Sequence, residues 1–253
     1  MITTAFETIT PAVASAMLEG NYDNRKLREF IVEQYANDMT QGRWKPNGAA
    51  IVFDTDGGLV DGQHRLRAVI ASKSTIDNVV VRGVERETRD TIDIHQVRSS
   101  GDILQMFHIP NGNNVAALCR MVIARENGDK KSLGSVKKVG KAAVIERAKT
   151  DLRLRYAVTV AATCGHVVRR APTALCRYII PDGARSEEFF QRLADGVGLE
   201  HGNPVLTLRN WSLRAGRQIS FAQSTEATLR AWCAFRDGRE ITFIKISGEL
   251  PKP

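Results

Sequence analysis

Apolar positions follow two different periods over the first part of the chain, about residues 5–110. Short apolar runs bounded by turn residues predict strands at 50–53, 59–60 and 79–81. Apolar residues at helical spacing, with start and stop signals at their ends, predict helices over 11–18, 26–41, 64–71, 86–93 and 101–107. This mixture of short strands and helices indicates an α+β fold.

The rest of the chain is mostly helical in pattern. We expect helices over 115–124, over 141–162 as one long helix or two short ones, and over 172–180, 186–196, 204–214 and 224–236. Residues 241–246 are rich in β-branched and aromatic side chains and predict a short strand. The sequence therefore predicts two domains: an α+β domain over 1–110, and a basic helical domain with a short C-terminal strand over 111–253.

The composition is that of an ordinary globular protein, with 253 residues of which 43% are hydrophobic and 25% are charged. The net charge of +8 is concentrated in one segment. Residues 120–180 hold 14 lysines and arginines but only 4 acidic residues, a local net charge of +10, so the rest of the chain carries −2. Such a segment favours a polyanionic partner.

The four cysteines form no C-x-x-C pair, so neither a zinc site nor a disulfide framework is expected. No apolar run reaches the length of about 18 residues that a membrane helix needs. The first residues lack the basic start and apolar run of a signal peptide. These features predict a cytoplasmic protein with reduced cysteines and no membrane partner.

Residue types suited to binding or catalysis are most concentrated in five residues, Asp61-Gly62-Gln63-His64-Arg65, between a predicted strand and a predicted helix. First-turn amides and the helix dipole favour an anion there, and an arginine adds a bidentate donor for phosphate. Histidine is the residue type whose ordinary pKa lies nearest neutral pH, and Asp61 could orient His64 or hold a cation. A phosphate or carboxylate pocket is one interpretation. A simple turn with Asp61 as the helix cap uses the same residues and is the other.

These five residues, followed by Leu66 and Ala68, resemble the D-G-x-H-R signature of the ParB/sulfiredoxin-like superfamily. The motif sequence, and the order of the predicted helices and strands up to about residue 108, are similar to those of ParB-like proteins from bacteriophages and prophages. Members of this superfamily include CTP-binding DNA-partition proteins, nucleases, small-molecule phosphotransferases and ATP-using sulfiredoxins. They share a nucleotide phosphate held at this motif.

The resemblance implies a ParB/sulfiredoxin-like N-terminal domain that binds a nucleoside triphosphate, with or without Mg²⁺. The implied nucleotide-binding residues are Asn24, Arg25, Gly62, Gln63, His64, Arg65, Arg67 and Arg98. Asp93 and His95 form a polar cluster with Arg98 that either closes the pocket or is solvated. Gln63 stands where sulfiredoxins have their reactive cysteine, so sulfiredoxin chemistry is not expected. The Gly-Glu-Arg-Arg sequence of the partition proteins is not reproduced, so CTP and ATP both stay open.

An enzyme of DNA metabolism is the alternative function for the same pocket: a nuclease, an NTPase, or a phosphotransferase that modifies a DNA base or a nucleotide. Asp61 or His64 would then be the catalytic acid or base, and Arg65 would stabilise the developing charge. Asp61 would also hold Mg²⁺ beside the nucleotide, since Mg²⁺ takes one or two carboxylates plus phosphate. Asp54 and Asp56 are further carboxylates in this region, but their spacing is more typical of a hairpin turn.

The basic segment supplies the predicted DNA-binding residues: Lys130, Lys131, Lys137, Lys138, Lys141, Arg147, Arg153, Arg169 and Arg170. Phosphate contacts through such residues give salt-dependent binding. A helix-turn-helix across 141–180 would present them to duplex DNA, and a homodimer would match the symmetry of a duplex site. Few aromatic residues accompany them, which favours duplex over single strands. Trp44, Trp211 and Trp232 are predicted to be core residues. A solvated surface, or one neutralised by an acidic partner, is the alternative.

Three functional hypotheses follow from these patterns. The first is nucleotide-regulated DNA binding, in which a triphosphate at 61–67 shifts the population of DNA-binding states. The second is an enzyme of DNA metabolism. The third is a non-catalytic phage interaction protein, which no nucleotide stabilises.

Overall fold

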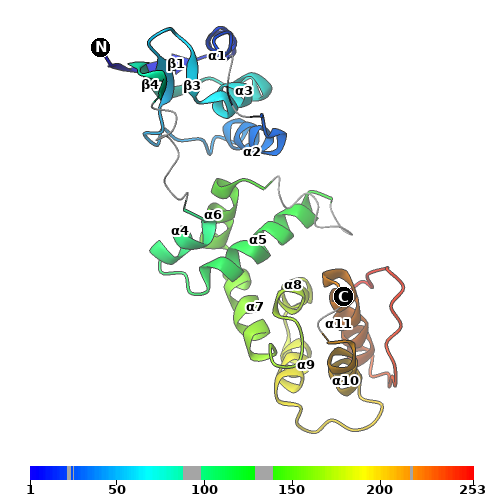
Figure 1. The fold of residues 1–253 in the computed structure, drawn as a ribbon. Coiled ribbons are helices and arrows are strands. Elements are labelled where there is room, and N and C mark those ends of the chain that lie inside the picture. The colour runs from blue at the N-terminus through cyan, green and yellow to red at the C-terminus, as the bar shows by residue number, and fades with distance from the viewer. Residues whose placement is uncertain (22–23, 25, 88–97, 129–138, 217–218) are drawn as a thin grey trace. The chain divides into compact units, whose positions relative to one another are not determined.

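The computed structural model describes residues 1–253 except 22–23, 25, 88–97, 129–138 and 217–218. The chain divides into two compact units (Figure 1). The first comprises Met1–Arg98 and Lys137–Ala143, and the second comprises Ser99–Val136 and Val144–Pro253. The first boundary lies between residues 98 and 99, and a second stretch, 137–143, also belongs to the first unit, whereas the sequence predicts a single boundary at residue 110. None of the helices in the described ranges combines the length and the apolar character that crossing a bilayer requires.

A four-stranded sheet in the order β1-β4-β2-β3 organises the first unit. Its strands are β1 (Thr3–Ile9), β2 (Ile51–Asp54), β3 (Leu59–Asp61) and β4 (Ile76–Val84). β4 pairs in parallel with β2 and antiparallel with β1, and β2 pairs antiparallel with β3. The three predicted strands are confirmed. β1 is absent from the prediction because it is an edge strand in which only Ile9 is buried, so its apolar pattern is weak.

Three helices complete the first unit: α1 (Pro11–Leu18), α2 (Glu29–Thr40) and α3 (Gln63–Ser72). In Figure 1 they lie together beside the sheet. The sequence signals explain where they begin, since Thr10 caps α1 and its Oγ1 accepts the Val13 N–H at 3.3 Å. Helices and strands share one apolar core, to which α2 contributes Val32, α3 contributes Leu66 and β4 contributes Val80. The α+β class predicted from the sequence is confirmed.

The second unit is helical in its described part. Its helices are α4 (Ser100–Met106), α5 (Gly112–Glu126), most of α6 (Lys141–Thr150), α7 (Leu152–Thr163), α8 (Arg170–Ile179), α9 (Ala184–Asp195), α10 (Pro204–Ala215) and α11 (Phe221–Arg236). α6 and α7 resolve the pattern over 141–162 into two short helices. The core includes Phe189 of α9, whose ring meets the rings of Trp232 and Phe235 of α11 edge-on at centroid distances of 5.6 and 5.5 Å.

Two predicted elements have a different outcome. The helix over 86–93 falls mostly outside the described residues. The prediction of a strand over 241–246 is wrong, because these residues form neither helix nor strand. Ile244 and Ile246 pack against the helical core instead, and the Ile241 carbonyl accepts a hydrogen bond from a side chain on α10. The β-branched pattern therefore reflects burial against helices rather than pairing in a sheet.

A buried carboxylate on α11 fastens the segment that follows this helix. Glu226 is only 2% exposed, and it accepts the Ser247 N–H at 2.7 Å and the Gly248 N–H at 2.9 Å. Arg230 Nε donates to the same carboxylate at 2.8 Å. Burial alone raises the pKa of Glu226, but these hydrogen bonds together outweigh it and hold the pKa below its usual range. Glu226 therefore stays charged inside the unit and ties residues 247–248 to α11.

Candidate functional site

The five-residue motif forms the turn from β3 into α3. Gly62 takes the left-handed backbone conformation at φ +114°, and a Cβ built there would lie only 3.1 Å from Ile51 Cγ1. Both facts require glycine at this position. The Gly62 N–H donates to Asp61 Oδ1 at 2.7 Å, and Gly62 has no side chain to cap the helix. The strand-to-helix junction predicted from the sequence is therefore present.

Arg65 binds the protein itself. Its side chain donates to Asp61 Oδ2 at 2.7 Å and to the Ala49 carbonyl, and the residue is 9% exposed. Asn78 Nδ2 donates to the same carbonyl at 3.0 Å. Two buried side chains thus converge on the loop that leads into β2. The guanidinium, which the resemblance assigns to phosphate binding, fixes this loop against α3.

His64 also has an internal partner. Its Nε2 accepts the backbone N–H of Arg28 at 3.1 Å, and the residue is 7% exposed. An accepting Nε2 carries no proton, so this hydrogen bond belongs to the neutral imidazole. Gln63 beside it is likewise buried. His64 therefore anchors the segment before α2 over the start of α3.

The remaining predicted nucleotide-binding residues lie in different surroundings. Asn24 Nδ2 donates to the Leu59 carbonyl at 2.6 Å, which ties the segment before α2 to β3. Arg67 is exposed on α3. Arg98 is exposed, and the hydrogen bond described for it joins its carbonyl to Lys141 Nζ. Arg25, Asp93 and His95 lie outside the described residues.

The carboxylates near the motif are engaged in turn geometry. Both oxygens of Asp61 have partners, the Gly62 N–H and Arg65. Asp54 Oδ1 accepts the N–H groups of Asp56 at 3.0 Å and Gly58 at 2.6 Å. Within the described residues, no group of three His, Cys, Asp or Glu side chains could hold a metal ion. This arrangement favours the turn interpretation of Asp54 and Asp56.

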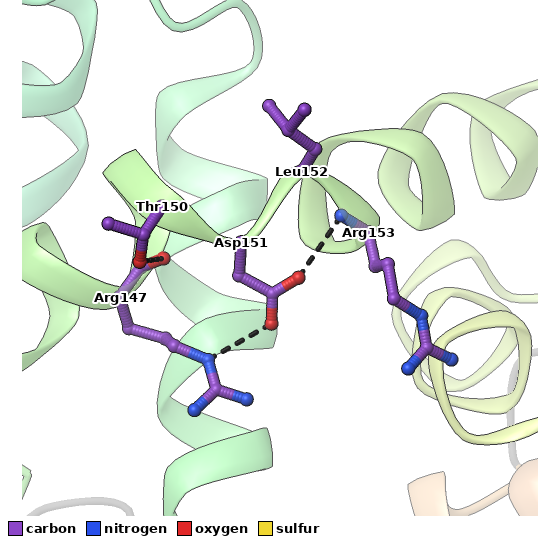
Figure 2. A pocket seen from close by; sticks show the side chains of 5 residues that line it. All are labelled: Arg147, Thr150, Asp151, Leu152 and Arg153. Atoms are coloured by element: carbon purple, nitrogen blue, oxygen red, sulfur yellow. Dashed lines mark hydrogen bonds and ion pairs between the residues drawn. The ribbon is translucent and has the colours of Figure 1, made fainter.

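Two of the predicted DNA-binding arginines flank Asp151 at the junction of α6 and α7 (Figure 2). Arg147 donates to Asp151 Oδ2 at 3.0 Å, to Glu126 and to the Tyr178 hydroxyl. The Arg153 N–H donates to Asp151 Oδ1 at 3.1 Å, and its guanidinium donates to the Tyr178 carbonyl. Burial alone raises the pKa of Asp151, but its bonds from Tyr178 and Arg147 outweigh this and lower it. Asp151 thus neutralises the start of α7 and part of the basic surface.

The other predicted DNA-binding residues divide between exposed positions and undescribed ones. Arg169 and Arg170 are exposed at the start of α8, where Arg169 also donates to the Ile219 carbonyl. Lys141 is exposed as well. The remaining predicted residues, Lys130, Lys131, Lys137 and Lys138, lie outside the described residues. α8 is buried over residues 172–177, so it lacks the free face that a recognition helix needs in a DNA groove.

A groove in the second unit is absent from the predictions made from the sequence. Trp232 is buried as predicted, and Trp44 packs against the core of the first unit. Trp211, however, both packs against the core and lines a groove with Asn210 and Arg214. The spacing of these three residues places them on one side of a helix, which was the available signal for the groove. The groove itself could not be predicted, because its other wall comes from a segment about thirty residues away in the chain.

In comparisons with known proteins, no family model matches the chain, and no curated protein or solved structure matches it. The resemblance to the ParB/sulfiredoxin-like superfamily therefore stays a prediction carried by residues 61–66 and their surroundings.

Proposed function

We propose that this protein binds a nucleoside triphosphate at the start of α3 and binds DNA through exposed basic residues of its second unit. In this proposal the first unit has a ParB/sulfiredoxin-like fold. The observation that supports it best is the junction at Gly62, where a strand passes into a helix through a left-handed glycine that supplies no capping side chain.

The junction favours a phosphate on electrostatic grounds. A helix N-terminus carries roughly half a positive charge, which stabilises an anion beside it. Asp61 is the acidic residue next to the junction, and its charge is compensated by Arg65. Three exposed cations lie on the segment before α2 and on α3: Lys26, Arg28 and Arg67. The backbone N–H of Arg28 is joined to His64, so this residue lies beside the start of the helix.

The same contacts favour binding over catalysis. An acid–base residue must reach the proton that it transfers. His64 Nε2 is occupied by a backbone N–H, and both oxygens of Asp61 have partners within the protein. Mg²⁺ would accompany the triphosphate, because this ion usually keeps several waters and relies on phosphate oxygens.

The DNA-binding part of the proposal rests on charge. Residues 120–180 carry a net charge of +10, and Lys149, Arg169 and Arg170 are exposed within this segment. Arg147 and Arg153 contribute less, because acidic partners offset them. Contacts to phosphate make the affinity fall with salt, by a slope of about 0.9 per phosphate on duplex DNA.

A thermal-shift screen with ATP, CTP and GTP, with and without Mg²⁺, tests the nucleotide site. A ligand at a hundred times its Kd adds roughly 2.7 kcal/mol of stability. Arg67→Ala should abolish the shift, while Lys45→Ala, at another exposed position of the first unit, should keep it. Arg65 is unsuitable for this test because it holds the fold. An absent shift with every nucleotide, or an undiminished shift in Arg67→Ala, contradicts the proposal.

Fluorescence anisotropy with a labelled duplex, over a series of salt concentrations, tests the DNA part. The double variant Arg169→Ala/Arg170→Ala should lower the slope of log K against log salt by about 1.8, the value for two lost phosphate contacts. Repeating the titration with the stabilising nucleotide shows whether the two ligands are coupled. A slope equal to that of the wild type would argue against these arginines as the contact.

A further inference from the structure

A groove of about 480 Å³ lies between α10 and the segment that follows α11. α10 contributes Asn210, Trp211 and Arg214, and the segment contributes Thr242 and Phe243. A volume of several hundred Å³ is typical of sites for small ligands rather than of surfaces for whole proteins.

Both walls of the groove are fixed by contacts within the second unit. The Ile241 N–H donates to the Gly202 carbonyl at 2.9 Å, and Thr207 Oγ1 donates to the Ile241 carbonyl at 2.6 Å. On either side of the groove, Trp211 and Ile244 pack against the core. The groove is therefore largely formed before any ligand enters.

The lining combines aromatic rings with positive charge. Phe243 is 74% exposed, which is unusual for so large an apolar side chain, and Trp211 lies partly open in the same groove. Arg214 adds a permanent charge, and Asn210 adds an amide that both donates and accepts hydrogen bonds. None of the described residues that line the groove is acidic. This set fits a flat, anionic ligand with polar edges.

We propose that the groove binds one nucleotide of a single-stranded nucleic acid, with its base against Phe243 and Trp211 and its phosphate beside Arg214. Aromatic platforms joined to cations are the usual means of holding single strands. A base inside a duplex is stacked between its neighbours and cannot reach such rings. The exposed rim, which includes Asn210 and Arg214, leaves the groove open to a continuing strand. The inference rests on the proposed function only in taking nucleic acid as the polymer, and it uses different residues.

The test is fluorescence anisotropy of the full chain with a labelled ten-nucleotide strand, and with a duplex of the same sequence. Phe243→Ala removes the exposed ring, and Arg214→Ala removes the charge. Each has a matched control outside the lining: Leu213→Ala alters an apolar residue on α10 that is 64% exposed, and Lys245→Ala removes a cation from the opposite segment.

Phe243→Ala should weaken single-strand binding at least about fivefold, the lower bound for loss of one base stack, and leave duplex binding unchanged. Arg214→Ala should lower the salt slope by about 0.7, the value for one contact to a single strand. Both controls should behave as the wild type. The proposed function is read from the nucleotide shift and from duplex binding, whereas this inference is read from single-strand binding, so the two proposals fail separately.

Three outcomes would overturn the inference. The first is single-strand binding that is absent, or that Phe243→Ala and Arg214→Ala leave intact. The second is an equal loss on duplex DNA. The third is competition by free mononucleotides as effective as that by the strand, which would assign the groove to a small nucleotide instead.

Discussion

The carboxylate of Glu226 should contribute much of the hydrogen-bond energy that holds residues 247–248 against α11. Replacing it by glutamine keeps the size but puts an amide NH₂ in place of one oxygen, facing groups that already donate. The Ser247 and Gly248 N–H groups then lose a charged acceptor. Hydrogen bonds to a charged group contribute about 1.5–3 kcal/mol each, and they are not additive when they share one acceptor.

We therefore expect Glu226→Gln to lower the free energy of unfolding of the second unit by about 3 kcal/mol. The ion pair with Arg230 adds little to this figure, because Arg230 is one-third exposed. For a unit of this size the loss corresponds to roughly 6–12 °C in Tm. The pKa of Glu226 is lowered in the folded state, so its contribution is complete above the ordinary carboxyl pKa and is lost as pH falls through the folded value. The difference between wild type and variant should therefore be largest at neutral pH and shrink in acid.

Urea denaturation followed by circular dichroism at several pH values measures this difference. Glu249→Gln is the matched control, because it removes the same charge from an exposed side chain of the same segment. Trypsin gives a second readout, since release of the segment should speed cleavage after Lys245. A free energy of unfolding of Glu226→Gln within about 0.5 kcal/mol of that of the Glu249→Gln control, at every pH, would contradict this role of Glu226.

Four further predictions concern other contacts. The Arg177 side chain is only 2% exposed, and its partners Asp182 and Glu187 are about half exposed. In urea denaturation, Arg177→Met should change the free energy of unfolding by less than about 1.5 kcal/mol, whereas Asp182→Asn/Glu187→Gln should lower it by about 3–5 kcal/mol, because it leaves the buried charge unpaired. Equal losses in the two variants would contradict this prediction. Gly62→Ala should cost about 1–3 kcal/mol, and more than Gly128→Ala, where the backbone is also left-handed but nothing lies within 4 Å of the new Cβ. Arg65→Ala should lower the Tm of the ligand-free protein while Arg67→Ala leaves it unchanged, and the reverse order would assign the structural role to Arg67. Burial raises the pKa of Cys119 to about 12 and that of Cys164 to about 11, so these thiols should react with Ellman's reagent at pH 8 only after unfolding.

Local signals in the sequence were sufficient for most helices of the fold. The Thr10-Pro11 pair marks the start of α1, and the glycine after α9 marks its end. The edge strand β1 lacked such a signal, because its pairing with β4 depends on residues about seventy positions away. Residues 241–246 gave a misleading signal, because apolar β-branched side chains suit a helical core as well as a sheet.

For the candidate site, the sequence located the junction but not the partners of its side chains. That Arg65 binds the Ala49 carbonyl, and that His64 binds the Arg28 N–H, depends on loops folded back over α3. In the basic segment, two of the three partners described for Arg147 lie on α5 and α8. The number of arginines in a segment follows from the sequence, but which of them form ion pairs with acidic residues depends on the tertiary fold.

The fastening of the segment after α11 has a consequence beyond stability. Glu226 holds this segment at residues 247–248, and the same segment supplies Thr242 and Phe243 to the groove against α10. Any molecule that needs both walls binds only the docked form, so occupancy and docking are thermodynamically linked. A bound molecule would raise the equilibrium constant for docking of the segment. Any change that lowers this docking constant would in turn weaken binding, because the two equilibria are coupled. A carboxylate that touches no ligand thereby sets part of the affinity of the groove.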